Sequence, residues 1–197
     1  MRVVAATGLV ACALVITACG GHTAQPLSDG QLQGLVLQSA DLPRTLERFS
    51  FEHELRSEQS PVLAGNSSRF GRQKGWVARY RRRGDPRLRG PLTVASTIEM
   101  FGRPAGASNY LDAVEKRDQE VASTTGLKEV TVPAIGSTSH ALESARAPHG
   151  SIRYVIVTWR EGRFVGSVSA SGYAELMAVR DVVMLARSQE KRVKGAT

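Results

Sequence analysis

Basic side chains are densest between residues 69 and 89, where the only acidic residue is Asp85. The members of this cluster are Arg69, Arg72, Lys74, Arg79, Arg81, Arg82, Arg83, Arg87 and Arg89. A guanidinium group can donate two parallel hydrogen bonds to one phosphate or carboxylate. The cluster therefore predicts a surface that binds an anion through phosphate or carboxylate groups.

Five of these arginines carry the prediction: Arg79, Arg81, Arg83, Arg87 and Arg89. Alternation along a strand over residues 76–82 places the first three on one face, while Trp76 and Tyr80 point to the other face and pack in the core. The last two follow Asp85-Pro86, which begins a turn. The alternative is a solvated strand edge, on which the charges hinder pairing with another sheet edge.

The residue types that catalysis and metal binding require are scattered. The histidines are His22, His53, His140 and His149, and no two have the spacing of a zinc site on a helix or strand. Ser139 and His140 are adjacent, which puts their side chains on opposite faces of a strand, and no Gly-x-Ser-x-Gly elbow occurs. We therefore predict no catalytic residue, no metal site and no cofactor, and a protein that is not an enzyme.

Carboxylates gather in and just before a helix predicted to begin at Pro104 and to end at Gly126. They are Glu99, Asp112, Glu115, Asp118 and Glu120. Lys116 and Arg117 lie within one helical turn of several of them, which is the spacing of surface charge pairs. We expect these carboxylates to be exposed and to pair with the two basic residues.

The N-terminus has the anatomy of an export signal. Arg2 precedes an apolar run from Val3 to Ile16, which is shorter than the roughly 20 residues of a membrane-spanning helix. Ile16-Thr17-Ala18-Cys19 resembles a bacterial lipobox, which implies that Cys19 carries the lipid; the alternative is a secretory signal cleaved without lipidation. The expected parts are a signal peptide over 1–18, a lipidated tether over 19–27 and one domain over 28–197.

Without the signal peptide the chain carries 25 Lys and Arg against 18 Asp and Glu. This basic balance favours anionic lipid headgroups, an envelope polymer or an acidic protein as partners, through long-range attraction. The lipid on Cys19 would supply the contact with the membrane and place the domain on the extracytoplasmic side of the cell membrane. That location argues against nucleic acid as a partner.

Hydrophobic periodicity predicts the order of the elements. Ser28 and Gln31 have the spacing of a capping box and begin a short first helix. The middle helix is preceded and followed by strands, expected around residues 49–53, 76–82, 92–101, 130–142, 152–160 and 163–170. Glu161-Gly162 suits a tight hairpin turn. An apolar stripe from Tyr173 to Ala186 predicts a last helix that covers the sheet.

This order favours an α+β domain with an antiparallel sheet of about five to seven strands and helices on its faces. Three motifs, Leu42-Pro43, Ile135-Gly136-Ser137 and the Arg160-Glu161-Gly162-Arg163 hairpin, resemble uncharacterised lipoproteins of high-GC Gram-positive bacteria. The element order also resembles PsbP-like domains. These resemblances imply a non-catalytic envelope domain of α/β/α type. Ser137 stands where such families commonly carry an acid, so a role of that acid is not carried over.

The sequence thus supports two functions. The first is a lipid-anchored, non-enzymatic binding or accessory module that meets an anionic envelope component or partner protein through the arginines. The alternative is a carrier of a lipid or another apolar ligand, held in a cavity between the sheet and the C-terminal helix. Met177 and Met184 are the residues that would line such a cavity, unless they belong to the ordinary core.

Overall fold

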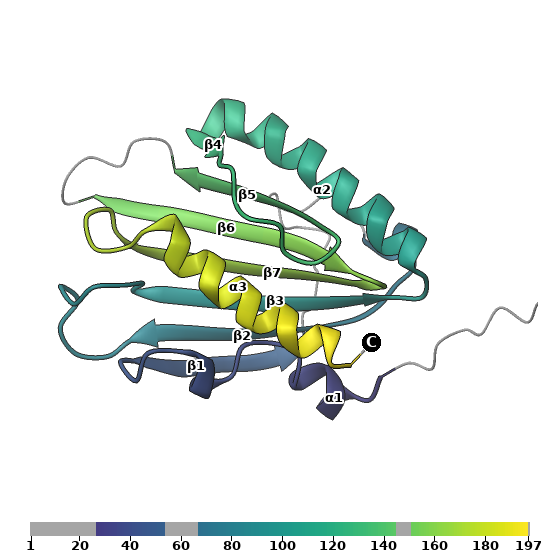
Figure 1. Ribbon diagram of the computed structural model, residues 1–197, viewed down its shortest axis with the longest axis horizontal. Helices are drawn as coiled ribbons and strands as arrows, with labels where there is room; N and C mark the ends of the chain where they lie inside the picture. The colour runs from purple at the N-terminus through teal and green to yellow at the C-terminus, as the bar shows by residue number, and fades with distance from the viewer. Residues whose placement is uncertain (1–26, 54–66, 145–150, 197) are drawn as a thin grey trace, which may run out of the picture.

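The computed structural model describes residues 27–53, 67–144 and 151–196, which form one antiparallel sheet with helices on both faces (Figure 1). The strands are β1 (Leu46–His53), β2 (Arg72–Arg82), β3 (Thr93–Phe101), β4 (Leu127–Glu129), β5 (Thr138–Ser144), β6 (Ile152–Glu161) and β7 (Phe164–Tyr173). The helices are α1 (Asp29–Gln33), α2 (Pro104–Thr125) and α3 (Val179–Lys194), with 3-10 turns η1 (Ser39–Asp41) and η2 (Ser67–Phe70). Within the described residues the sheet has seven strands in the order β1-β2-β3-β7-β6-β5-β4, which confirms the predicted fold class.

Strand β2 shows how the sequence separates the two faces of the sheet. Trp76, Ala78 and Tyr80 are buried in the cluster that α3 covers. Arg79 and Arg81 alternate with them and therefore lie on the opposite face. The predicted alternation in this strand is confirmed.

The first face is covered by α3 together with the N-terminal segment (Figure 1). The residues that α3 buries include Val182, Val183, Leu185, Ala186 and Val193. Helix α1 has the predicted capping box between Ser28 and Gln31, but it ends after five residues. Leu35 and Val36 lie beyond its end and are buried in the core.

Two strands hold the backbone of Leu37 against this face. The hydroxyl of Tyr80 donates a hydrogen bond to the Leu37 carbonyl at 2.5 Å, and the Leu37 N–H donates to Ser96 Oγ at 2.9 Å. Burial raises the pKa of Tyr80, so its hydroxyl remains a donor. The segment therefore crosses the sheet without leaving these two backbone groups unsatisfied.

Helix α2 covers part of the opposite face. It begins at Pro104, where a missing N–H costs nothing, and it stops at Gly126, whose φ of 70° is the left-handed conformation that glycine favours. Both predicted ends are correct. A second core cluster forms between the helix and the sheet, with Phe101, Ala107, Tyr110, Leu111, Val114 and Val165 as its buried members.

The β6–β7 hairpin was predicted one residue too early. Glu161 pairs with Phe164, so the turn consists of Gly162 and Arg163, with Gly162 at a φ of 53°. Trp159 of β6 is fully buried and lies opposite Gly166 of β7. The absence of a side chain at Gly166 provides the space for the indole ring.

Other predicted boundaries were wrong as well. The last helix begins at Val179, because residues 164–173 remain in strand β7 and the chain then turns; Met177 lies in that turn and is buried. Strand β2 begins at Arg72, four residues before the start expected at residue 76. The stretch over 130–142 was expected to be one bent strand, yet β4 and β5 are separated by residues 130–137.

Replacing Gly166 with alanine should destabilise the domain by about 1–3 kcal/mol, because overpacking forces a buried group to shift. A Cβ at this position would lie 2.4 Å from Trp159 Cζ2 and 2.5 Å from Cε2. Gly30→Ala is the matched control, since a Cβ there meets nothing within 4 Å. Urea unfolding measures both variants. Equal stability of Gly166→Ala and the parent chain would contradict the packing described above.

Replacing Tyr80 with phenylalanine should cost about 1–3 kcal/mol, because the buried Leu37 carbonyl loses its donor. Tyr173→Phe serves as the control: within the described residues the Tyr173 hydroxyl makes no hydrogen bond, and its removal should change stability by less than about 0.5 kcal/mol. Thermal unfolding of the two variants decides the matter. Equal losses would mean that the Tyr80 hydroxyl does not hold the segment.

Candidate functional site

Arg79 and Arg81 pair with acidic residues of the edge strand β1. Arg79 Nη1 lies 2.6 Å from Glu52 Oε1, and Arg81 Nε lies 3.2 Å from Glu47 Oε1. The strand register brings Glu47 directly opposite Arg81. A hydrogen bond from Ser50 and the charge of Arg79 lower the pKa of Glu52, which keeps this carboxylate charged. The charges of these two strand arginines are therefore compensated by their neighbours.

Arg83, Arg87 and Arg89 lie together in the loop that joins β2 to β3, and all three are exposed. Arg83 Nε lies 2.7 Å from Glu47 Oε2, with 76% of the Arg83 side chain exposed. In the described part of the chain, the guanidinium groups of Arg87 and Arg89 have no acidic partner. We refer to residues 83–92 as the arginine hairpin. The structure thus brings three of the five predicted arginines together at one end of the sheet.

Arg82 differs from these exposed arginines, because its guanidinium group holds the backbone of the arginine hairpin. Its Nε and Nη2 donate to the Pro91 carbonyl at 3.1 and 2.8 Å, and Nη2 also donates to the Arg89 carbonyl at 3.1 Å. Gly90, at a φ of 105°, donates its N–H to the Leu176 carbonyl at 2.8 Å. These contacts fix the hairpin against the turn that precedes α3.

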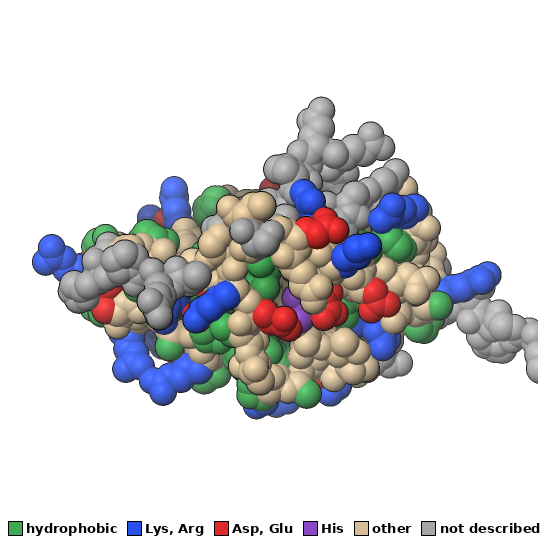
Figure 2. Space-filling view, turned by 90° about the horizontal axis from the view of Figure 1, so that it is seen from above, with side chains coloured by type: hydrophobic (Ala, Val, Ile, Leu, Met, Phe, Trp, Pro, Cys, Tyr) green, Lys and Arg blue, Asp and Glu red, His purple; other side chains and the backbone are tan. Residues whose placement is uncertain are grey.

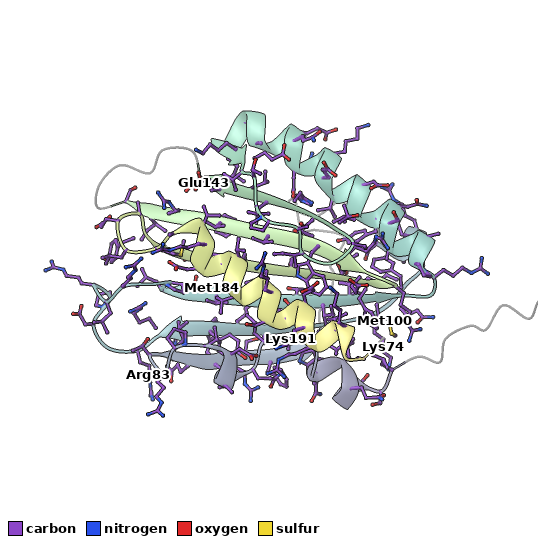
Figure 3. All side chains as sticks on the ribbon, viewed as in Figure 1. Lys74, Arg83, Met100, Glu143, Met184 and Lys191 are labelled. Atoms are coloured by element: carbon purple, nitrogen blue, oxygen red, sulfur yellow. The ribbon has the colours of Figure 1, made fainter. Side chains whose placement is uncertain are left out.

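The arginine hairpin and the beginning of the described chain lie at opposite ends of the sheet. Figure 3 labels Lys74, near the start of β2, and Arg83, just beyond its end. Lys74 Nζ lies 2.8 Å from Asp29 Oδ1, which ties α1 to the first of these two ends. The chain therefore enters the domain far from the clustered arginines.

A groove runs along α3 beside the arginine hairpin, with a volume of about 450 Å³. Its walls include Asp41, Pro43, Arg89, Pro91, Met184 and Leu185. Met184 is 59% exposed, although both of its neighbours in the sequence are buried. We call this feature the α3 groove. It lies beside α3 and not beneath it, because the inward side chains of the helix fill the core.

The expectation that Glu99 and Asp118 are exposed was wrong. Glu99 is 1% exposed, and its Oε1 lies 2.6 Å from Arg72 Nε. Asp118 is 9% exposed, and its Oδ2 lies 2.9 Å from His140 Nε2. Lys116 pairs with neither, and the α2 side of the molecule shows interspersed acidic and basic side chains (Figure 2). Two carboxylates therefore lie inside, between α2 and the sheet.

Glu99 and Asp118 line a cavity of about 40 Å³ together with Tyr110, Thr158 and Ser167. Such a volume accommodates about two or three water molecules, which is too little for a lipid or a sugar. His140 Nδ1 is buried and has no hydrogen-bond partner among the described residues. The arrangement attaches α2 to β5 through a histidine–carboxylate contact, and it offers no room for a substrate.

The part of the chain that the structure describes contains no group of three or more potential metal-ligating side chains. Among the same residues no helix is long and apolar enough to span a membrane. Cys19, His22 and His149 lie outside the described residues, as do the predicted signal peptide and most of the tether. The lipidation of Cys19 therefore stays a prediction.

The chain matches no protein-family model and no curated protein sequence. Among solved structures, it is similar to the crystal structure of the extracellular domain of PknH from Mycobacterium tuberculosis, with a TM-score of 0.63. The two sequences are 12% identical, and the match covers 86% of this chain and 98% of that domain. The chain therefore has the fold of the PknH extracellular domain.

Proposed function

We propose that this protein is a non-enzymatic binding or accessory module on the extracytoplasmic side of the membrane, which contacts an anionic envelope component or an acidic partner protein. The arginine hairpin carries the proposal. Arg87 and Arg89 are exposed, and within the described residues no acidic group compensates them. A phosphate or carboxylate could therefore bind without displacing an internal ion pair. The free energy of binding would then be more favourable than at buried or paired arginines.

The rigidity of the arginine hairpin supports this function. Binding to a flexible loop costs conformational entropy, and a loop that is already ordered avoids most of that cost. Arg82 and Gly90 supply the order through their hydrogen bonds to neighbouring backbone. Leu88, which is 45% exposed between Arg87 and Arg89, adds an apolar contact to the same surface.

The position of the arginine hairpin also supports a site that faces away from the anchor. A lipidated tether over residues 19–27 extends at most roughly 30 Å. Strand β2, with 11 residues, places about 35 Å between the end where the chain enters and the arginine hairpin. The likeness to the extracellular domain of PknH supports an extracytoplasmic location. A protein attached in this way would present its arginines to molecules outside the membrane surface.

The α3 groove favours the alternative function, a carrier of a lipid or another apolar ligand. Its volume of about 450 Å³ lies within the range of roughly 300–1,000 Å³ that small-molecule sites occupy. A carrier normally encloses most of its ligand, whereas this groove is an open channel beside a helix. We therefore rank the carrier second.

Replacing Cys19 with serine should abolish lipidation and move the protein from the membrane fraction to the soluble extracytoplasmic fraction. The reason is that acyl chains, at about 0.8 kcal/mol per buried methylene, would supply most of the membrane affinity. Metabolic labelling with an alkyne fatty acid, followed by fractionation, measures both effects. Cys12→Ser is the control and should retain label and location. Labelling that persists without Cys19 would contradict the predicted anchor.

Replacing Arg83, Arg87 and Arg89 together with glutamine should weaken binding to polyphosphate or polyglutamate by at least about tenfold. Each charge-assisted hydrogen bond is worth roughly 1.5–3 kcal/mol, so the loss of one suffices for this effect. Fluorescence anisotropy with labelled polymer measures the affinity, using residues 19–197 with Cys19→Ser so that no lipid is attached.

The control removes the same number of charges elsewhere, through glutamine at Arg69, Arg103 and Lys116, which are all exposed. This control should bind within about twofold of the parent, since screening limits the reach of exposed charges to about 10 Å. Equal losses in the two triple variants would show that net charge alone drives binding and would refute a site at the arginine hairpin.

A further inference from the structure

Met184 is the most exposed of the large apolar side chains in the described residues. Val183 and Leu185 on either side of it are 7% and 8% exposed, so of these three residues Met184 is the one that points outward. A methionine side chain is flexible and polarisable, and it adapts to apolar ligands of irregular shape. Met184 lines the groove together with Pro43 and Pro91, and these side chains give the groove an apolar lining.

The charged groups on the walls of the α3 groove differ in how far they are already engaged. Asp41 accepts from Arg192, with Nη2 to Oδ1 at 2.8 Å and Nε to Oδ2 at 3.0 Å. Asp181 Oδ2 accepts from the Ala178 N–H at 2.8 Å, at the positive end of the α3 dipole. Arg89 is the remaining charge, and no acidic partner for it exists among the described residues. Arg89 is thus the group on the rim that can pair with an acidic group of a ligand.

We propose that the α3 groove binds an anionic amphiphile, with its apolar part on Met184 and Leu185 and its acidic group at Arg89. This inference rests on the proposed function, since it names the ligand class that the arginine hairpin would meet. Arg89 and Pro91 belong both to the arginine hairpin and to the groove wall, so they join the basic surface to the apolar lining at Met184. The groove is not the predicted cavity between the sheet and the helix, because Met177 is buried in the core. An anion without an apolar part would use only half of this site.

The size of the groove limits the occupant. A volume of about 450 Å³ is in the lower half of the range for small-molecule sites, which suits a single apolar chain segment and not a folded partner domain. The groove is also open, so the acidic group remains in contact with water while the chain is desolvated. Affinity is therefore expected to depend on both parts of the ligand.

The test compares three probes by isothermal titration calorimetry, below the concentration at which they form micelles. Lysophosphatidylglycerol has the acidic group and one acyl chain, glycerol phosphate has the acidic group alone, and lysophosphatidylcholine has the same chain without net charge. The protein is residues 19–197 with Cys19→Ser. We expect lysophosphatidylglycerol to bind at least about tenfold more tightly than either of the other probes.

Two variants separate the groove from the arginine hairpin. Met184→Gln places an uncharged amide in the apolar lining and should weaken lysophosphatidylglycerol by about tenfold or more, while polyphosphate binding at the arginine hairpin stays unchanged because no charge is added beside Arg89. Arg89→Gln should weaken lysophosphatidylglycerol but not lysophosphatidylcholine. Ile152→Gln is the matched control, because Ile152 is 49% exposed and does not line the groove, and it should leave all affinities unchanged.

Several results would overturn the amphiphile site or the proposed function. Equal affinity for lysophosphatidylglycerol and glycerol phosphate, or no effect of Met184→Gln, would overturn the groove as an amphiphile site and leave the arginine hairpin as an anion site. Equal affinity for lysophosphatidylglycerol and lysophosphatidylcholine would overturn the acidic group as a determinant. If none of the arginine variants loses polyphosphate binding, the proposed function is refuted, regardless of the affinity for lysophosphatidylglycerol.

Discussion

The hydrogen bonds that hold Leu37 between Tyr80 and Ser96 are the constraint on which the rest of this fold depends. A seven-stranded sheet is too wide for one helix, and α3 covers only part of its first face. The remaining area is covered by a segment with little regular structure, whose backbone groups bond partly within the segment and partly to side chains of the sheet. Because side chains of β2 and β3 satisfy the Leu37 N–H and carbonyl, this segment can be buried without the cost of unpaired polar groups.

The placement of that segment determines where the α3 groove lies. Beyond Leu37 the chain makes the turn η1, and Asp41 within it binds Arg192 near the end of α3 through two hydrogen bonds. Gln189 of the same helix donates to the Thr97 carbonyl at 2.8 Å. The C-terminal half of α3 is thus drawn onto the sheet, and its N-terminal half stands beside the arginine hairpin. The groove is the space that these contacts leave between them.

The sequence could predict features that depend on local periodicity. Alternation in β2 separated Trp76 and Tyr80 from Arg79 and Arg81, and Pro104 and Gly126 marked the ends of α2, because each signal arises within a few neighbouring residues. Glu99 escaped prediction for the opposite reason: its partner Arg72 is 27 positions away, in another strand. The one available signal was Phe101, which lies two residues later on the same face and required a cover there.

Partners that are distant in the sequence also decide which arginines remain available to a ligand. Their abundance is visible in the sequence, but their availability depends on β1, whose register places Glu47 and Glu52 against the strand arginines. Net charge consequently overstates the basic surface, since compensated arginines repel an approaching cation little and attract an anion weakly. The guanidinium groups of Arg87 and Arg89 lie in the loop beyond the sheet, where no acidic side chain among the described residues pairs with them. The edge strand β1 thus compensates the arginines of β2 and leaves the positive charge of this basic stretch at Arg87 and Arg89. These residues lie at the end of the domain opposite the point where the chain enters.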